Sequence, residues 1–506
     1  MRGVVAAGHP LTAEAGADVL RAGGNAVDAA VAAVLMSFVA ESPLTGPGAG
    51  GFMVVHAPGE THVLDFFVAA PGLGLEDREP ASLVPVDVHF SKDAVQRFSV
   101  GPASCGAYGT TLGLAETLSR FGTVSLADLT AGPARAAREG VEVVPMQAFL
   151  FTVLEPIVTS TPECAAIYAP AGRLLREGDT IRLPELGDLL ERLGAEGPGF
   201  LYGGDLAHAV SDWVLERGGM LSREDLASYE VIERQPARVT YRGREVLTNP
   251  PPSSGGILIA DALGILERLD QPHDPYVVAE VIASTNRARD EEFLAGLGTE
   301  GFLERFLAKQ ALDTVATEVR SRLGNTTHIS VMDAEGACAS VTCSNGSCSG
   351  VVVQGTGMHL NNMLGEQDLN PLGFHRHPPG ARVPSMMAPT VVLRDGDPEI
   401  AIGSAGSNRI RSAILQTVLG VVDHGLAAQE AVSAPRLHVE ERQVDAEPGV
   451  DEAALDRLEQ AGYEVRRWSE RKLFFGGVQA VARNPDTGRL TGGGDPRRGG
   501  VASVVG

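Results

Sequence analysis

The sequence has few cysteines, few aromatic residues and little positive charge. Its 506 residues include five cysteines, 5% aromatic side chains, and 41 Lys and Arg against 64 Asp and Glu, for a formal net charge of −23. An odd number of cysteines without any CxxC pair predicts neither a disulfide framework nor a zinc site. The acidic balance disfavours binding to nucleic acid, because both surfaces would be negative.

Long apolar runs are also missing. The longest, residues 29–39, is too short to cross a bilayer, so no membrane association is expected. The chain begins Met1-Arg2-Gly3 and reaches His9-Pro10 without the charged, apolar and cleavage regions of a signal peptide. We therefore expect a cytoplasmic enzyme or binding protein, and no cofactor or metal ion.

The secondary-structure pattern changes along the chain. Gly23-Gly24-Asn25 divides residues 11–35 into two helices, a glycine-rich loop at 43–51 precedes a strand at 52–56, and 112–235 is mostly helical. Alternating residues predict a hairpin from 327–332 and 337–344. Further strands are predicted at 351–354, 390–393, 399–402 and 477–483, and helices at 257–269, 410–424 and 452–461. Helices first and strands later indicate a layered α/β protein.

One short segment is suited to nucleophilic catalysis. In Asn325-Thr326-Thr327-His328, a cut before Thr326 would free an α-amine that could serve as the base for the Thr326 hydroxyl. The small, flexible Gly324-Asn325 lead-in would let that hydroxyl approach the upstream carbonyl. Taken alone, these four residues favour the polar start of a strand over a catalytic segment.

Twelve motifs place this segment in a wider pattern. In chain order they are His9-Pro10 with Ala13, Gly23-Gly24-Asn25-Ala26-Val27-Asp28-Ala29-Ala30, Glu41 through Gly50-Gly51-Phe52, Phe121-Gly122-Thr123, Gly218-Gly219 with Asp225-Leu226 and Tyr229, Pro251-Pro252-Ser253-Ser254-Gly255-Gly256, Thr326-Thr327-His328, Leu360-Asn361-Asn362, Met387-Ala388-Pro389-Thr390, Gly403-Ser404-Ala405-Gly406, Ala434-Pro435-Arg436 and Asp495-Pro496-Arg497. Over almost the whole chain the sequence thus resembles the γ-glutamyltranspeptidase family.

The resemblance implies a fold and a reaction. The fold would be a four-layer αββα sandwich of the N-terminal-nucleophile hydrolase type. Self-cleavage between Asn325 and Thr326 would give a large subunit, 1–325, and a small subunit, 326–506, which together form one shared fold. Thr326 would attack a γ-glutamyl amide of a small molecule, as in glutathione metabolism, and water or an amine would release the acyl group.

Three supporting roles follow from the same resemblance. Ser344 corresponds to a hydroxyl near the nucleophile. Gly406 and Ser407 correspond to the Gly-Gly pair whose backbone N–H groups form the oxyanion hole, and such donors contribute several kcal/mol (~3–4) each to transition-state stabilisation. Asn345 corresponds to an Asn that helps to hold the amino end of the substrate.

The residues that grip the substrate depart from the family pattern. Where the family has an Arg for the α-carboxylate, this chain has Phe67. Of two acids that bind the α-ammonium, the first is Met363 and the second is kept as Glu366. Of two serines, Ser385 is kept and the other is Met386. An apolar pocket of this kind would disfavour a zwitterion by several kcal/mol (~4), about a thousandfold in specificity.

Three hypotheses remain at this point. The first is a self-processing threonine amidohydrolase or acyltransferase that acts on something other than glutathione. The second is an ordinary γ-glutamyl hydrolase or transpeptidase in which another arginine, Arg382 or Arg409, supplies the carboxylate contact. The third is a catalytically silent scaffold that keeps only the fold, against which the intact Thr326-Thr327-His328 and Gly406 argue.

Overall fold

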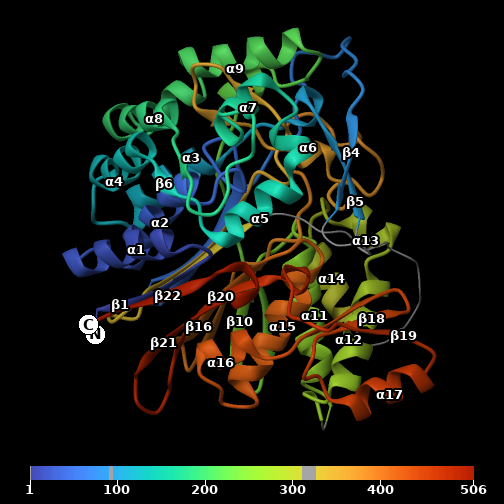
Figure 1. Cartoon of the computed structure of the whole chain (residues 1–506). Helices are drawn as coiled ribbons and strands as arrows, with labels where there is room; N and C mark the ends of the chain where they lie inside the picture. The colour runs from blue at the N-terminus through green and yellow to red at the C-terminus, as the bar shows by residue number, and fades with distance from the viewer. Residues whose placement is uncertain (1, 58, 90–94, 270, 310–325) are drawn as a thin grey trace.

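The computed structural model describes residues 2–57, 59–89, 95–269, 271–309 and 326–506. Within these ranges two large sheets lie face to face (Figure 1). The first has seven strands in the order β22-β1-β11-β12-β2-β3-β8 and the second has six in the order β21-β20-β16-β15-β10-β9. In chain order their bounds are β1 Gly3–Ala7, β2 Gly50–Ala57, β3 Glu60–Phe66, β8 Ile232–Arg234, β9 Ala237–Tyr241, β10 Arg244–Thr248, β11 Thr327–Asp333, β12 Cys338–Ser344, β15 Thr390–Arg394, β16 Asp397–Ala405, β20 Gly477–Arg483, β21 Leu490–Gly494 and β22 Val501–Val505.

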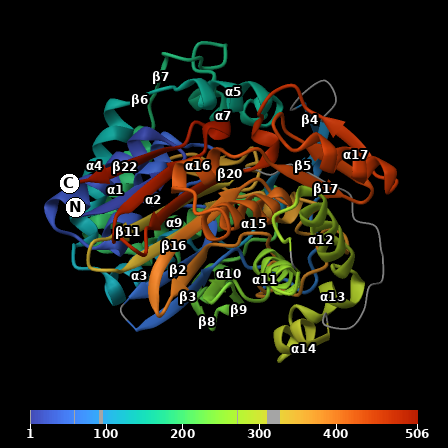
Figure 2. The ribbon, with the colours of Figure 1, turned by 90° about the horizontal axis from the view of Figure 1, so that it is seen from below.

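Helices cover the outer face of each sheet. One layer packs on the first sheet and contains α1 Pro10–Ala22, α2 Ala26–Ala40, α3 Thr110–Phe121 and α4 Leu126–Glu139, with α5 Pro145–Val153, α6 Glu155–Val158, α7 Pro162–Tyr168, α8 Pro184–Glu196, α9 Asp205–Glu216 and α10 Arg223–Ala227 beyond them. The other layer contains α11 Ser254–Leu266, α12 Pro275–Ala288, α13 Glu291–Gly296, α14 Phe302–Lys309, α15 Arg409–Val422, α16 Ala428–Ser433 and α17 Glu452–Gln460. Figure 2, seen from below, shows this second layer.

Smaller strand groups lie outside the two sheets. They are β4 Val84–His89 with β5 Val95–Val100, β6 Val141–Glu142 with β7 Thr180–Ile181, β13 Val352–Val353 with β14 Met358–His359, and β17 Leu437–Glu440 with β18 Gln443–Ala446 and β19 Glu464–Arg467. In the described part of the chain, no helix has both the length and the apolar character needed to span a bilayer.

The apolar core is divided by the sheets into three layers. One lies between the first sheet and its helices, one between the sheets, and one between the second sheet and its helices. Helix α2 shows why the sequence folds this way. Asn25 caps it in a reciprocal capping box with Asp28, and nearly every side chain along it is buried, as expected for a helix covered on all sides. All five cysteines are free and buried, consistent with core packing.

The segments before and after Thr326 are interleaved. Strand β1 from the N-terminal end pairs with β11 on one side and β22 on the other, and both of those belong to the later segment. The second sheet likewise joins β9 and β10 to β15, β16, β20 and β21. The two predicted subunits therefore share both sheets, and the chain termini lie side by side (Figure 1).

The layered α/β prediction and the four-layer αββα fold are confirmed. The hairpin is present as β11 and β12, and the break at Gly23-Gly24-Asn25 separates α1 from α2. The edge and terminal strands were not predicted from the sequence. Strands β1 and β22 are short and lack a clear alternation of polar and apolar residues, and only partners about 300 or more residues away define them as strands.

Candidate active site

Thr326 lies directly before β11, at the end of the first sheet. Thr327 pairs with Cys343 across the β11–β12 ladder, so the next register position places Thr326 opposite Ser344. Alternate residues of a strand share a face, and Thr326 therefore shares its face with His328 and Ser344 shares its face with Thr342. His328 contacts Thr342 and packs against Gly403 of β16 in the second sheet, which places both hydroxyl-bearing residues, Thr326 and Ser344, on the face toward that sheet. Asn325, the other side of the predicted cut, lies outside the described residues.

His328, two residues after Thr326, lies between the two sheets and contacts both. Its Nε2 donates to Ser330 Oγ (2.9 Å), because that hydroxyl already donates to the Gln479 carbonyl (3.1 Å). Its Nδ1 then accepts from Thr342 Oγ1 (2.8 Å). Burial lowers the pKa of His328 to about 3, so the ring is neutral and serves as a fixed connector rather than as a base.

The predicted oxyanion residues lie across from Thr326 at the end of β16. Gly403 packs against the His328 ring, where an added Cβ would lie 2.2 Å from Cε1. Two residues further along, Ala405 lines the same cavity as Thr326, and Gly406 and Ser407 follow it in a turn before α15. Their φ angles are 125° and 52°, so both residues have left-handed backbones. The fold therefore brings Gly406 and Ser407 to the Thr326 end of the inter-sheet space.

Asp368 holds Ser407 in this unusual conformation. A non-glycine residue in the left-handed region costs roughly 1–2 kcal/mol, and the Ser407 hydroxyl donates to Asp368 Oδ2. Burial raises the pKa of Asp368, and the Ser407 hydrogen bond with the nearby Arg289 and Arg409 guanidiniums offsets part of this effect. The Asp368–Ser407 contact thus fixes the backbone N–H that the family resemblance assigns to the oxyanion hole.

Replacement of Asp368 by Ala should lower kcat about tenfold or more with little change in KM, because a misplaced oxyanion donor weakens only the transition state. Asp368→Asn keeps an acceptor for Ser407 and should retain most of the rate. Ser407→Gly relieves the backbone, so the Asp368→Ala loss should shrink in that background. Steady-state kinetics of the four variants decide; equal losses in Asp368→Ala and Asp368→Asn would contradict this role.

Asn345 and Glu366 lie next to Ser344. Asn345 Nδ2 donates to the Pro43 carbonyl (3.2 Å), and its Oδ1 is buried without a partner among the described residues. Glu366 accepts from the Ser347 backbone N–H. Burial, followed by the Asp368 carboxyl, raises the pKa of Glu366 to about 8. A carboxyl that is mostly protonated near neutral pH is a poor preformed partner for an ammonium group.

The apolar replacements occupy two places. Phe67 stacks on Phe52 with ring centroids 5.2 Å apart. Met363 and Met387 belong to the same buried apolar cluster. Met386 instead packs in the core between the second sheet and its helices. Ser385 accepts from Met387 N at its hydroxyl (3.1 Å) and from Ser254 N at its carbonyl (2.8 Å), which places it in the loop contact beside α11.

The two arginines considered as alternatives already have contacts. Arg382 lies 3.4 Å from Asp65 and over the Tyr229 ring, 4.4 Å from its centroid. Arg409 lies over Phe474 at 4.3 Å. Both side chains are therefore used within the fold.

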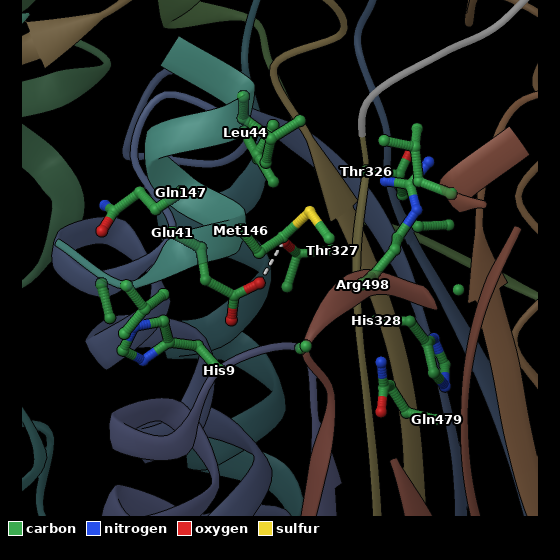
Figure 3. Close-up of a pocket in the computed structure, with 18 of the residues that line it drawn as sticks. His9, Glu41, Leu44, Met146, Gln147, Thr326, Thr327, His328, Gln479 and Arg498 are labelled. Atoms are coloured by element: carbon green, nitrogen blue, oxygen red, sulfur yellow. Dashed lines mark hydrogen bonds between the residues drawn. The ribbon is translucent and has the colours of Figure 1, made fainter. Parts of the chain in front are cut away.

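A cavity opens directly beside Thr326 (Figure 3). Its wall contains apolar residues from the loop that contains Pro43, from α5 and from the segment before β20. It also contains polar residues. The lining residues are Gly8, His9, Ala40, Glu41, Ser42, Leu44, Val144, Met146, Gln147, Leu150, Thr326, Thr327, His328, Ala405, Leu473, Gly477, Gln479, Arg498 and Gly499. None of the predicted substrate-binding residues is among them, so this cavity, which reaches Thr326, is separate from those residues.

Glu41 is the central acid of this cavity. Thr12 Oγ1 donates to its Oε1 (2.7 Å) and Thr327 Oγ1 to its Oε2 (2.8 Å). Burial raises the pKa of Glu41 to about 7, against the lowering effect of the two threonines and of Arg498. Glu41 therefore links Thr327, the residue after Thr326, to Thr12 in α1, and it changes charge near neutral pH.

Glu41→Gln should change how stability depends on pH. The folded pKa of Glu41, about 7, exceeds its unfolded value of 4.5, so its favourable contribution is complete below pH 4.5 and is lost as pH rises through 7. The Glu41→Gln variant is neutral at every pH. Its stability relative to wild type should therefore rise as the pH increases from 4.5 to 7, by about 3 kcal/mol at most. Tm measured for both proteins from pH 4 to 8 tests this, and a constant difference would contradict it.

Arg498 lies on the Thr326 side of the cavity (Figure 3). Its stem crosses Gly477, where an added Cβ would lie 2.2 Å from Arg498 Cδ. Burial lowers the pKa of Arg498 to about 10, so the guanidinium remains charged. It adds positive charge close to Thr326.

Sequence reasoning did not assign roles to Asp368, Gln147 or Arg498. The family motifs contain Glu41, His9 and Arg497, which is the neighbour of Arg498. These motifs were the one sequence signal that could have pointed to this cavity. Gln147 lies in a helix without any motif, and nothing in the sequence marks it.

Comparison with known proteins agrees with this geometry. The family model for gamma-glutamyltranspeptidase matches residues 12–505. The acylase ACY 1 proenzyme of Pseudomonas sp. (strain SE83) is 34% identical over 97% of this chain and 91% of the relative. The glutathione hydrolase proenzyme of Escherichia coli (strain K12) is 30% identical over 98% and 90%. The crystal structure of cephalosporin acylase from Bacillus halodurans has a TM-score of 0.84 at 25% identity and covers 99% of this chain and 95% of that one.

These matches extend over both sheets, both helical layers and every motif from Ala13 to Asp495-Pro496-Arg497. Such relatives make the protein an enzyme of the hydrolase or transferase type. The chain belongs to the gamma-glutamyltranspeptidase family.

Proposed function

We propose that this protein cleaves itself before Thr326 and uses Thr326 to attack the acyl carbon of a small amide other than glutathione. The freed Thr326 amine takes the proton from Oγ1 as Oγ1 bonds to the carbonyl carbon. The Gly406 and Ser407 N–H groups receive the oxyanion, and Ser344 orients the nucleophile. Collapse expels the amine, which takes up the proton, and water or a second amine releases the acyl group.

The observation that carries the choice of substrate is the packing at Phe67 and Met363. These side chains fill one closed apolar cluster, and Arg382 and Arg409, the two arginines considered as replacements, already have other contacts. A γ-glutamyl α-carboxylate would have to displace this cluster without gaining an ion pair. The relatives named acylase support the same conclusion.

The second candidate is a γ-glutamyl hydrolase or transpeptidase. Relatives named glutathione hydrolase favour it, as does the retained Glu366. The raised pKa of Glu366, caused by burial and Asp368, weakens it.

A matched set of nitroanilides separates the two. γ-Glutamyl-, glutaryl- and pentanoyl-p-nitroanilide share one chain length and differ only in their charged groups. We expect the γ-glutamyl compound to have the lowest kcat/KM of the three, by about a thousandfold. Glutathione turnover is measured beside them. A γ-glutamyl compound that is turned over best would establish the second candidate, and no turnover of any compound would leave the silent scaffold.

A further inference from the structure

The far end of the cavity from Thr326 carries polar groups that the proposed mechanism does not use. His9 and Gln147 are each 4% exposed and line this end together with Glu41 (Figure 3). His9 Nε2 and both polar atoms of the Gln147 amide have no hydrogen-bond partner in the described part of the chain. A buried polar group without a partner is unfavourable, so these groups are available to hydrogen-bond a bound molecule.

The hydrogen-bonding character of this end follows from the contacts around it. His9 Nδ1 accepts from the Leu11 backbone N–H (3.1 Å), so the proton of the neutral ring is on Nε2. His9 thus presents a donor, and Gln147 presents a donor and an acceptor. Burial lowers the pKa of His9 to about 4, which keeps the ring neutral.

This set matches a primary amide better than it matches a carboxylate. An amide oxygen can accept from His9 Nε2, while its NH₂ donates to Gln147 Oε1. A carboxylate would find the two donors but would also face Gln147 Oε1 and the Glu41 carboxyl. The charged Arg498 lies at the other end, beside Thr326.

The remaining walls determine what connects this end to the nucleophile. Leu44, Met146, Leu150 and Leu473 also line the cavity. The cavity has a volume of about 50 Å³, which is room for a few waters or a short chain. An aliphatic acyl chain is the group that this shape and polarity accommodate.

We propose that His9 and Gln147 form a subsite for an uncharged, amide-bearing end of the acyl group, carried on a short aliphatic chain whose carbonyl is presented to Thr326. This inference rests on the proposed function and specifies its substrate class.

Acyl-nitroanilides with four to six carbons and three different ends test it. At the best length, the amide-ended compound should exceed both the methyl-ended and the carboxylate-ended one in kcat/KM by tenfold or more. Gln147→Leu should abolish that ratio. Gln271→Leu, an exposed glutamine, is the matched control and should keep it. A carboxylate-ended optimum, or a ratio that survives in Gln147→Leu, overturns the subsite although turnover itself persists.

A second measurement applies if no compound is turned over and the proposed function fails. Glutaramide should raise the Tm of the wild-type protein and should not raise that of Gln147→Leu, because the subsite alone is enough to bind it. Equal shifts, or no shift in the wild type, overturn the subsite.

Discussion

Thr326→Ala should leave the protein as one uncut chain of 52.8 kDa without acylase activity. The wild-type protein should give two fragments in an intact-mass spectrum under denaturing conditions, the second beginning at Thr326. The physical reason is that the same hydroxyl attacks first the Asn325 carbonyl and then the substrate. Loss of a covalent nucleophile should reduce kcat by at least about 10⁴-fold.

Thr326→Ser is the matched variant because it keeps the hydroxyl. It should still cleave and turn over substrate, at lower rates, because the missing methyl leaves the side chain less ordered between β11 and β16. Ser344→Ala should slow both steps while leaving them detectable. Cleavage of the Thr326→Ala protein at the same bond would show that a different residue performs the cut. An uncut wild-type chain would remove the free amine that the mechanism requires.

Asp495→Ala should give a large loss of stability. Asp495 accepts hydrogen bonds from Arg436 Nη1 (2.8 Å), Arg497 Nη1 (3.2 Å) and the Val478 backbone N–H (2.8 Å). The side chains of Asp495, Arg436 and Arg497 are almost completely buried. Burial would raise the pKa of Asp495, and the Arg436 and Arg497 guanidiniums outweigh it, so its pKa is lowered. Removal of one partner from such a group leaves uncompensated buried charge and costs about 3–5 kcal/mol.

Thermal unfolding tests this prediction. With an unfolding entropy of about 2 cal/mol/K per residue, such a loss lowers Tm by about 3–5 °C if the whole chain melts as one unit. The matched control is Asp212→Ala, which breaks the exposed pair with Arg223 (2.6 Å) and should change Tm by less than about 1 °C. Equal shifts in the two variants would contradict a special role for the buried network. Activity should fall together with stability, because Arg498, the next residue after Arg497 in the chain, lines the cavity beside Thr326.

The sequence predicted the elements whose signal is local. Gly23-Gly24-Asn25 ends one helix and begins the next through its own caps, and the turn at 333–336 closes the hairpin that carries Thr326. Strand β1, which lies between β22 and β11 in the first sheet, has no such signal, because both partners come from the far end of the chain. Local patterns cannot report pairings of that separation.

The same distinction applies to the site. Thr326, Ser344 and Gly406 could be proposed because they stand in motifs, and the register of β11, β12 and β16 then brings their segments to one end of the sheets. Their catalytic roles, the roles of Asn345, Glu366 and Ser385, and the division at 325/326 remain predictions. Asp368 acts on Ser407 across 39 positions of sequence, and Gln147 enters the cavity from a helix that no motif marks. Only the tertiary packing reveals these two.

The pairing of β1 with β22 brings the two ends of the chain together, which makes a circularly permuted protein possible. The Arg2 N–H donates to the Val505 carbonyl (2.8 Å), so a short loop could join the present ends of the chain. A circular permutant opened before Thr326 would then begin with the initiator methionine followed by that threonine, and removal of the methionine would leave the threonine at the amino terminus. Its α-amine would be free without any internal cut, and maturation and acyl transfer could be studied as separate reactions in one fold.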